Sequence, residues 1–330
     1  MLNTRFFHTE LPARPMGRYA HIVLLRVTEG YALFQTDGEL NRARVAAGAG
    51  GANAGTAMTR IALFKRKQTT PERLNGRELL RHYNVLSDSN DEKDENACIY
   101  NVKACRKCPD CITYGFAIGD GGSEKSKVYS DTAFSLTDYA SSHEVFTLNA
   151  PFEDGTMSEQ GVVSSRINSQ DHVKPQTIFP AVITTRDLTL PLFEYVLGNV
   201  IRTTRYGATT TRGGTMRNHI AAIVLSDGEI FSNLLFTQRL YDLLAENNIL
   251  MPNEPVPVQT TLEAAAIVVP QLLDEDGVRN QQVLMGDDLT AYLDSIRGQD
   301  ENTMHTVLQQ AAHEALTYHD KYVAKQGKKK

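Results

Sequence analysis

Residues 98–111 read CIYNVKACRKCPDC and hold every cysteine of the 330-residue chain, namely Cys98, Cys105, Cys108 and Cys111. Thiolates at such short intervals can turn toward one centre, because the loop between them folds back on itself. Soft anionic donors of this kind suit tetrahedral zinc or an iron–sulfur cluster. Two disulfides packed into the same stretch would be strained and would close almost no chain. The spacing therefore predicts a metal site with these four ligands.

Zinc is the favoured metal. A bacterial ferredoxin cluster also uses the spacing Cys-x-x-Cys-x-x-Cys, but its further cysteine follows the triplet, whereas Cys98 precedes it here. An iron–sulfur cluster stays open as an alternative, and so does a shell in which His82 or His143 replaces one cysteine. Metal binding would supply folding free energy to a small lobe that has too few apolar residues to fold by itself.

Composition is that of an ordinary globular protein, with 41% hydrophobic and 22% charged residues. The first residues have no apolar core typical of a signal peptide, and no run of about eighteen apolar residues predicts a membrane helix. Clustered, reduced cysteines are typical of the cytoplasm. We therefore expect a cytoplasmic protein without a membrane partner.

Charge is distributed unevenly along the chain. Residues 1–86 carry 13 Lys and Arg against 6 Asp and Glu, whereas residues 227–330 carry 8 against 16. Residues 40–71 and 195–220 contain no acidic residue, and they hold six and four basic residues respectively. The first of these stretches includes a glycine-rich segment, 48–55, that we expect to be flexible. Basic stretches without compensating acids favour a nucleic-acid-binding protein.

Hydrophobic periodicity predicts an α+β fold in which strands and helices interleave around one sheet. Expected strands cover 21–36 with a break at 29–30, then 125–136, 176–185 and 220–225. One expected helix begins after Pro109. The other expected helices cover 71–84, 188–202, 233–245, 261–273, 288–296 and 304–323. We interpret 1–330 as one domain with a metal-clipped insertion at 87–122, a protruding hairpin at 143–174 and a mainly helical lobe at 232–325.

Enzyme motifs are missing from the sequence. It has no phosphate-binding Gly-x-x-x-x-Gly-Lys-Ser/Thr loop, no Gly-x-Ser-x-Gly elbow and no His-Glu-x-x-His helix. The expectation is a protein that is not an enzyme. Asp131 and Asp138 are the acids nearest the lysine-bearing strand, so a magnesium-dependent endonuclease is the main alternative, and an iron–sulfur redox protein is a weaker one.

Several motifs, in their order and spacing, resemble a known family. They are the basic glycine-rich insertion after the first strand, the Cys-x-x-Cys-x-x-Cys-x-x-Tyr-Gly run at 105–115, the Lys-Ser-Lys-Val strand at 125–128 and the run YGATTTRGGTMRN at 206–218. Together they are similar to the backbone subunit of the type I-D CRISPR Cascade complex, a member of the RAMP superfamily. The similarity extends over about residues 15–325.

This resemblance implies a palm with an antiparallel sheet that is RRM-like (ferredoxin-like), together with a finger insertion, a thumb hairpin and a helical lobe. It implies a non-catalytic subunit whose copies form a helical filament along the CRISPR RNA spacer and present it to a target DNA strand. The other partners would be the large subunit, the small subunit and the subunit that binds the 5′ handle. Some RAMP relatives cut nucleic acid, which is why the endonuclease alternative stays open.

Carried onto this chain, the resemblance places the metal-clipped insertion in the fingers and residues 143–174 in the thumb. Backbone contacts to RNA are expected rather than base stacking, because the usual RRM aromatics are not evident. The predicted RNA-binding residues are Arg42, Arg44, Arg60, Lys65, Lys67, Lys125, Lys127, Arg166, His172, Arg202, Arg205, Arg212 and Arg217.

Overall fold

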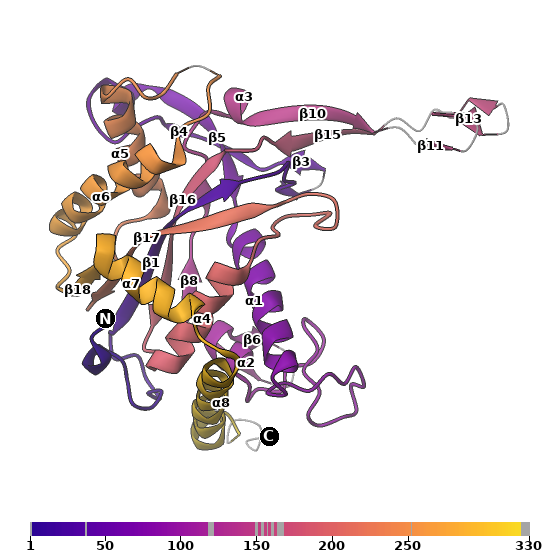
Figure 1. The fold of residues 1–330 in the computed structure, drawn as a ribbon, viewed down its shortest axis with the longest axis vertical. Helices are drawn as coiled ribbons and strands as arrows, with labels where there is room; N and C mark the ends of the chain where they lie inside the picture. Colours follow the sequence, from indigo (N-terminus) through magenta and orange to yellow (C-terminus); the bar gives the residue numbers. More distant parts are fainter. Residues whose placement is uncertain are drawn as a thin grey trace.

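The structure is a computed structural model that describes residues 2–36, 38–117, 122–148, 151–152, 155–156, 158–159, 162–163, 168–251 and 253–324. Its central sheet is antiparallel throughout and has the strand order β18-β17-β1-β16-β8 (Figure 1). The five strands, in that order, are Asn280–Leu284, Met216–Ser226, Tyr19–Thr28, Ile178–Arg186 and Val128–Ser130.

Strand β1 is buried along its whole length and separates two hydrophobic cores. Ile22 and Leu24 belong to one core, and Val23 and Leu25 belong to the other. This alternation follows from the two-residue period of a strand, and a nearly continuous apolar run is what a strand covered on both faces requires. The layers of the molecule are therefore helix, sheet and helix.

Helices from distant parts of the chain cover the two faces of the sheet (Figure 1). The face toward Ile22 carries α1 (Lys65–His82), α2 (Pro109–Tyr114), α4 (Leu190–Arg202), α7 (Gly286–Arg297) and α8 (Glu301–Tyr318). The face toward Val23 carries α5 (Asn233–Glu246) and α6 (Val258–Glu275). A π-helical turn, His319–Val323, follows α8.

A two-stranded hairpin extends from the body of the molecule (Figure 1). Its strands are β10 (His143–Leu148) and β15 (Asn168–Val173), which pair in antiparallel fashion. Beyond them lie the short pairs β11 (Pro151–Phe152) with β12 (Gly155–Thr156) and β13 (Ser158–Glu159) with β14 (Val162–Val163). The backbones of Ala32 and Val173 exchange two hydrogen bonds of 3.2 and 2.8 Å at its base, which joins the hairpin to the segment after β1.

Smaller elements complete the fold. A second sheet pairs β4 (Arg42–Ala46) with β5 (Ala57–Leu63), which pairs in turn with β9 (Ala133–Phe134). The remaining strands are β2 (Gln35–Thr36), β3 (Glu39–Leu40), β6 (Phe116–Ala117) and β7 (Ser123–Glu124). The short helical turns are η1 (Thr4–Phe6), η2 (Gly51–Gly55) and α3 (Tyr139–Ser142).

Most predicted elements are confirmed, but the second strand expected within 21–36 is reduced to β2 and to a single bridge between Ala32 and Val173. Helix α1 begins at Lys65 instead of Pro71, because Gln68 in its first turn is buried and its Nε2 donates to the carbonyls of Leu63 and Asp131. The single strand expected at 125–136 is divided between β8 and β9, which belong to different sheets. The polar strand β18 was not predicted, since only two of its five residues are apolar.

The glycine-rich segment 48–55 is not the free tip that its composition predicts. It forms η2, and its backbone is bound to Asp242 of α5. Throughout the part of the chain that the structure describes, no helix combines the length and apolarity needed to cross a membrane.

Candidate metal centre and nucleic-acid interface

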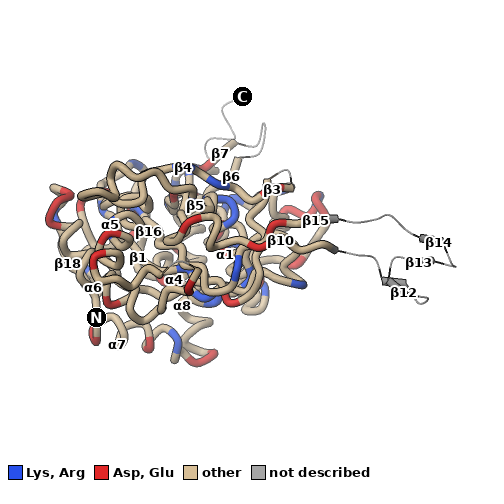
Figure 2. Tube along the Cα trace, turned by 90° about the horizontal axis from the view of Figure 1, so that it is seen from above, with Lys and Arg blue, Asp and Glu red and all other residues tan. Residues whose placement is uncertain are grey.

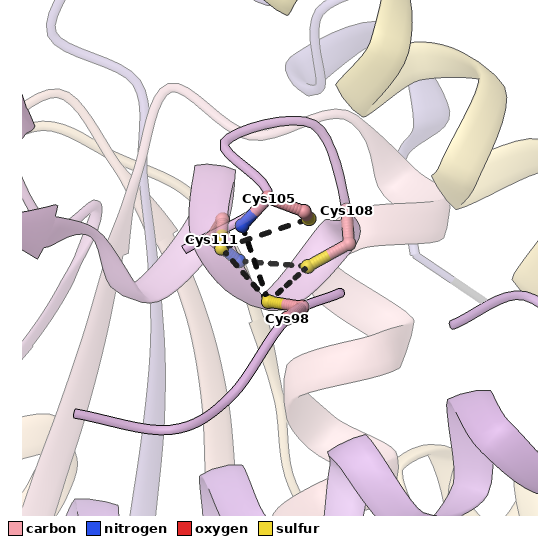
Figure 3. A group of neighbouring side chains, drawn as sticks. All are labelled: Cys98, Cys105, Cys108 and Cys111. Carbon is pink, nitrogen blue, oxygen red and sulfur yellow. Dashed lines mark hydrogen bonds between the residues drawn. The ribbon is translucent and has the colours of Figure 1, made fainter. Parts of the chain in front are cut away.

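The four cysteine sulfurs converge on one point (Figure 3). All lie within 4.8 Å of one another, and three of the six separations are 4.0 Å for Cys98–Cys108, 3.6 Å for Cys98–Cys111 and 4.0 Å for Cys105–Cys111. A tetrahedral ion with zinc–sulfur bonds of about 2.3 Å would separate its sulfurs by about 3.8 Å. The arrangement therefore fits a single tetrahedral metal. All four cysteines are free of disulfide bonds.

Backbone hydrogen bonds orient these sulfurs. Cys108 caps the N-terminus of α2, and its Sγ accepts the backbone N–H of Cys111 at 3.4 Å. In the same way, Cys98 Sγ accepts the backbone N–H of Cys105 at 3.4 Å. Pro109 occupies the first turn of α2, where its missing N–H costs nothing. Within the described residues, the cluster of ligands includes neither His82 nor His143.

Two arginines of α1 lie against the cysteine cluster. Arg77 places its guanidinium 3.4 Å from Cys98 Sγ and 2.9 Å from Asp110, and Arg73 contacts the two oxygens of Asp110 at 3.0 and 2.9 Å. Burial alone would lower the pKa of Arg77, but Asp110 and Cys98 raise it above its usual value. A fixed positive charge beside thiolates offsets part of the negative charge that four sulfur ligands bring to a metal.

The cysteine segment is part of the main hydrophobic core and not a separate lobe. Cys98, Cys108 and Cys111 are buried in the same cluster as the side chains of α1, α4 and α8. Ile112 and Tyr114 of α2 extend this core, which corrects the expectation of a lobe too poor in apolar residues. A hydrogen bond of 3.0 Å between His319 Nδ1 and the Arg106 carbonyl also fastens the loop to the end of α8. The cluster thus joins chain segments far apart in sequence.

An open groove of about 780 Å³ lies between the first turns of α1 and residues 203–210. The two acid-free stretches meet here, because Arg66 and Lys67 come from the first and Arg205 comes from the second. Hydroxyl and amide side chains lie between the cations, and among the described lining residues Glu78 is the acidic one. The polar lining residues besides these are Gln35, Thr36, Thr70, Asn75, Thr203, Thr204 and Thr210. Lys and Arg residues gather around α1 in Figure 2.

Most of the predicted RNA-binding cations are exposed to solvent. Arg42 lies 5.2 Å from the centre of the Tyr139 ring, and Arg217 forms an exposed ion pair of 2.9 Å with Glu29. Of the predicted residues, Lys67 and Arg205 line the groove itself. The exposed set is Arg42, Arg44, Lys65, Lys125, Arg205, Arg212 and Arg217.

The prediction for Arg60 is wrong. Its side chain is fully buried, and its guanidinium donates to the backbone carbonyls of Ala47, Ser135 and Leu136. These bonds hold β5 against the chain after β9, so the charge cannot reach RNA in this conformation. Acid-free sequence around Arg60 could not distinguish this structural role from a surface role.

Other predicted residues lie away from the groove. Lys127 is half-buried, with its Nζ 2.7 Å from Glu124 and 4.5 Å from the centre of the Tyr318 ring, and Arg202 is half-buried beside Met304. Neither residue lines the groove. Arg166 lies outside the described residues.

Aromatic side chains gather at the base of the hairpin, a feature missed at the sequence level. Tyr31 is 38% exposed, and its ring contacts Phe146 at 4.7 Å and His172 at 6.3 Å between ring centres. The predicted residue His172 therefore lies in an aromatic cluster. No local signal could have found this cluster, because its three members come from segments more than 20 residues apart.

Of the two acidic residues offered for the endonuclease alternative, Asp138 has a structural role. Asp138 caps α3 by accepting the backbone N–H of Ser141 at 2.8 Å. Across the described ranges, neither Asp131 nor Asp138 joins a group of three or more potential metal ligands.

Comparison with known proteins gives one family. A family model described as Csc2 Crispr matches residues 6–308. The crystal structure of Thermofilum pendens Csc2 is similar to this chain, with a TM-score of 0.55 and 17% identity over 93% of this chain and 90% of that chain. This likeness shows a mixed α/β fold with antiparallel sheets and helices, which confirms the predicted class at that level.

Two further matches are chains of solved structures titled "CRISPR RNA-guided surveillance complex" and "CRISPR RNA-guided surveillance complex, pre-nicking". Their TM-scores are 0.46 and 0.48, their identities are 10% and 8%, and each match covers 90% of this chain. The matches cover 99% and 100% of those chains, respectively. No curated protein matches this chain.

Proposed function

This chain belongs to the Csc2 CRISPR family, and on that basis we propose that it is a non-catalytic, RNA-coating backbone subunit of a type I-D CRISPR Cascade complex. Its copies would follow one another along the CRISPR RNA as a helical filament and present the RNA to a target DNA strand. The large subunit, the small subunit and the 5′-handle-binding subunit would be its other partners, in the cytoplasm.

The groove between α1 and residues 203–210 is the observation that carries this proposal. Three cations and a series of hydroxyls face a surface that is open to solvent. Such groups contact phosphates and sugars, which are the same in every nucleotide, and so they bind RNA without reading its bases. A subunit that leaves sequence recognition to base pairing needs this kind of surface.

The strand order supports an RRM-like palm. Strands β17-β1-β16-β8 lie side by side and antiparallel, and α1 and α4 come after β1 and β16 on one face. This is the arrangement of a ferredoxin-like β-α-β-β-α-β unit. In this proposal the β10–β15 hairpin is the thumb, residues 87–122 belong to the fingers, and residues 232–325 form the helical lobe.

We propose that the four cysteines hold a structural zinc ion. Four sulfurs within 4.8 Å of one another, which would fill all four positions of a tetrahedral ion, support a closed structural site. An iron–sulfur cluster uses the same ligand type and is the alternative. The site would connect the loop 98–108 to α1 and α8, and it would supply no chemistry.

Binding to single-stranded RNA tests the proposed function. We expect affinity to increase with RNA length and to fall as salt concentration rises, because phosphate contacts release counterions. Exchanging the groove residues Arg66 and Arg205 for Glu should weaken binding by about tenfold or more. The matched control exchanges the exposed Arg279 and Arg297 for Glu, which changes the net charge equally but lies on the helical lobe. The proposed function is contradicted if binding is unaffected by both salt and the first pair of substitutions.

Incubation of the pure protein with RNA and Mg²⁺ separates this function from the endonuclease alternative. We expect intact RNA. A regular ladder of products that disappears in Asp131→Ala would instead establish a nuclease.

A further inference from the structure

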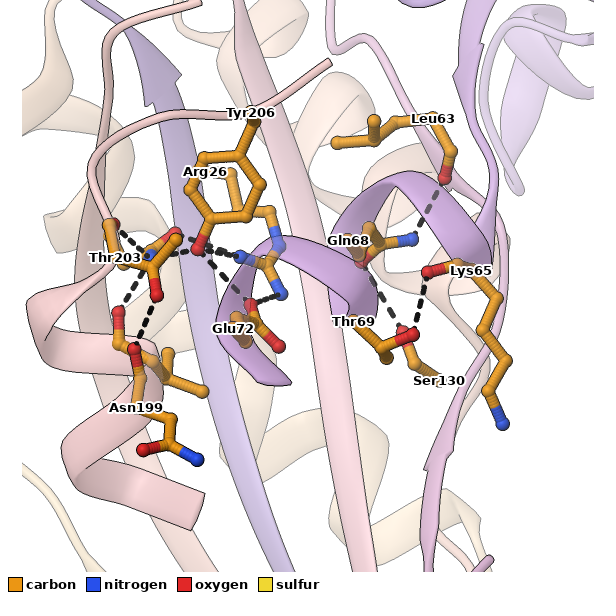
Figure 4. Close-up of polar contacts among 12 residues, drawn as sticks. Arg26, Leu63, Lys65, Gln68, Thr69, Glu72, Ser130, Asn199, Thr203 and Tyr206 are labelled. Carbon is orange, nitrogen blue, oxygen red and sulfur yellow. Dashed lines mark hydrogen bonds and ion pairs between the residues drawn. The ribbon is translucent and has the colours of Figure 1, made fainter. Parts of the chain in front are cut away.

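A buried polar cluster lies beneath the groove (Figure 4). Arg26 of β1 and Glu72 of α1 form an ion pair of 2.7 Å, and their side chains are 0% and 1% exposed. Tyr206, which is also fully buried, places its hydroxyl beside this ion pair, 3.1 Å from each partner. Charged groups are seldom buried to this extent unless they are paired and hydrogen-bonded. The pairing between Arg26, Glu72 and Tyr206 is therefore a fixed feature of the fold.

Every hydrogen-bonding position of the Tyr206 hydroxyl is used. It accepts from Arg26 at 3.1 Å and from Asn218 Nδ2 at 2.7 Å, and it donates to Glu72 Oε1 at 3.1 Å. One donor and two acceptor positions are all that a hydroxyl offers. This single oxygen thus connects β1, β17 and α1.

The same contact spans the two walls of the groove. On one wall, Arg205 and Gly207 flank Tyr206 and line the groove, while the ring of Tyr206 points into the core. On the other wall, Thr70 and Leu74 line the groove, each two residues from Glu72 on α1. The bond from Tyr206 to Glu72 therefore joins the walls from below.

Residues 203–210 also form backbone contacts with parts of the chain other than α1. Tyr206 N–H donates to Gly214 O at 2.9 Å, and Ala208 N–H donates to Leu33 O at 3.0 Å. Gly207 has φ +89°, and a Cβ there would lie 2.6 Å from Leu33 O, so the close approach requires glycine. These backbone contacts fix the segment against Leu33 and Gly214, whereas the Tyr206 hydroxyl fixes it against α1.

From the juxtaposition of the Tyr206 hydroxyl with Glu72 beneath the groove, we infer that Tyr206 is a positioning residue for RNA binding. It holds residues 203–210 at a set distance from α1, so that Arg205 faces the same RNA phosphates as Arg66 and Lys67. The inference rests on the proposed function, because it assigns the groove to the RNA backbone. Preorganised cations bind more tightly than cations that must be ordered by the ligand.

Tyr206→Phe tests this inference, because it removes the hydroxyl and keeps the ring and the ion pair. We expect affinity for single-stranded RNA to fall roughly tenfold, the equivalent of one charge-assisted hydrogen bond. The slope of log affinity against log salt should decrease by about 0.7, which corresponds to one phosphate contact on single-stranded RNA. The matched control is Tyr292→Phe, which removes a hydroxyl that donates to Glu194 at 3.3 Å, away from the groove. That variant should bind RNA like the wild type.

Repeating the Tyr206→Phe substitution in an Arg205→Ala variant distinguishes the positioning of Arg205 from a general loss of stability. In Arg205→Ala, the same Tyr206→Phe change should alter affinity by less than about twofold, because the side chain that it positions is gone. An equal loss in both backgrounds, or no loss in either, would overturn the inference while leaving the proposed function intact. Failure of the wild type to bind RNA would contradict the proposed function itself. If Tyr206→Phe does not fold, Asn218→Ala loosens the same hydroxyl by removing its 2.7 Å donor, together with the bond from Asn218 to the Val200 carbonyl. Because the Tyr206–Glu72 bond stays in place, a smaller loss of affinity is expected, and that loss should again shrink in the Arg205→Ala background.

Discussion

At the scale of single residues, a polar side chain on a buried strand can make the stability of the fold depend on pH. His21 lies near the start of β1 and is fully buried. Its ring nitrogens form hydrogen bonds with Thr184 at 2.8 Å and with Ser226 at 3.0 Å. Burial lowers the pKa of His21 to about 4, because the imidazolium form would lose its hydration. The folded protein therefore keeps this histidine neutral.

This lowered pKa predicts a dependence of stability on pH. In the unfolded chain His21 takes up a proton near pH 6.5, whereas in the folded chain it does so only near pH 4. The unfolded state thus binds the proton first, and stability is lost as pH falls through this window, by up to about 3 kcal/mol. Denaturant unfolding at several pH values should show a smaller loss for His21→Asn. His313→Asn, an exposed change on α8, should behave like the wild type, and equal slopes in all three proteins would contradict the prediction.

Cys108→Ser tests the metal centre at the same scale. Cys108 is both a proposed ligand and the N-cap of α2, so its loss should release the metal and lower the melting temperature. Elemental analysis should find one zinc per wild-type chain and little in the variant, and amide hydrogen exchange should increase in 98–111. Ser87→Ala, in the preceding loop, is the control. A brown protein with visible absorbance would establish an iron–sulfur cluster instead.

At the scale of elements, a single carboxylate determines the conformation of a segment that composition alone describes as loose. Asp242 of α5 accepts the backbone N–H groups of Ala49 and Gly50 at 2.8 and 2.9 Å. It also accepts Asn53 Nδ2 at 2.9 Å. Gly48 passes so close that a Cβ there would lie 1.7 Å from Asp242 Oδ1. The glycines thus permit a close approach between two elements instead of providing flexibility.

Asp242→Ala should free this segment. We expect the amides of 48–55 to exchange with solvent at least about tenfold faster, because the loss of one charge-assisted acceptor costs more than about 1.4 kcal/mol. Hydrogen exchange followed by mass spectrometry measures this directly. Glu246→Ala, an exposed change one turn later on the same helix, should leave the exchange unchanged. Slow exchange of 48–55 in Asp242→Ala would show that other contacts hold the segment.

At the scale of the whole molecule, the fold separates charge. The acid-free stretches contribute to one groove beside α1, while the C-terminal third, with 16 acidic against 8 basic residues, forms the helices α5 to α8. In Figure 2, acidic segments lie around α5, α6 and β18 and also along β10 and β15, and basic segments lie around α1. A polyanion should therefore approach from the side of the groove.

Because the groove presents cations and hydroxyls, binding should depend little on RNA sequence. We expect single-stranded RNAs of equal length but different sequence to bind within about threefold of one another, since phosphate and sugar contacts carry no sequence information. Fluorescence anisotropy with a homopolymer and two mixed sequences measures this. A preference greater than about tenfold would indicate base readout and would point to the aromatic cluster of Tyr31, Phe146 and His172.

Local sequence determined the features whose partners are near in the chain. The cysteine spacing predicted a cluster that the structure brings together, since its four ligands need only one short loop to meet. The apolar run of β1 predicted a buried strand, and the periodicity of α4 to α8 predicted helices. In both cases the spacing of apolar residues indicates which side chains of the element are buried. The two acid-free stretches predicted a polyanion-binding surface, which stays a prediction until RNA binding is measured.

Tertiary structure alone decided which residues form that surface. Arg60 and Arg66 lie in the same acid-free stretch, yet Arg60 is fully buried by carbonyls of a distant segment and Arg66 lines the groove. The early start of α1, the pairing of β18 and the contact between Tyr206 and Glu72 depend likewise on partners many residues away. Sequence patterns report local periodicity and charge, whereas burial and convergence depend on which distant segments pack together, and packing is a property of the folded chain.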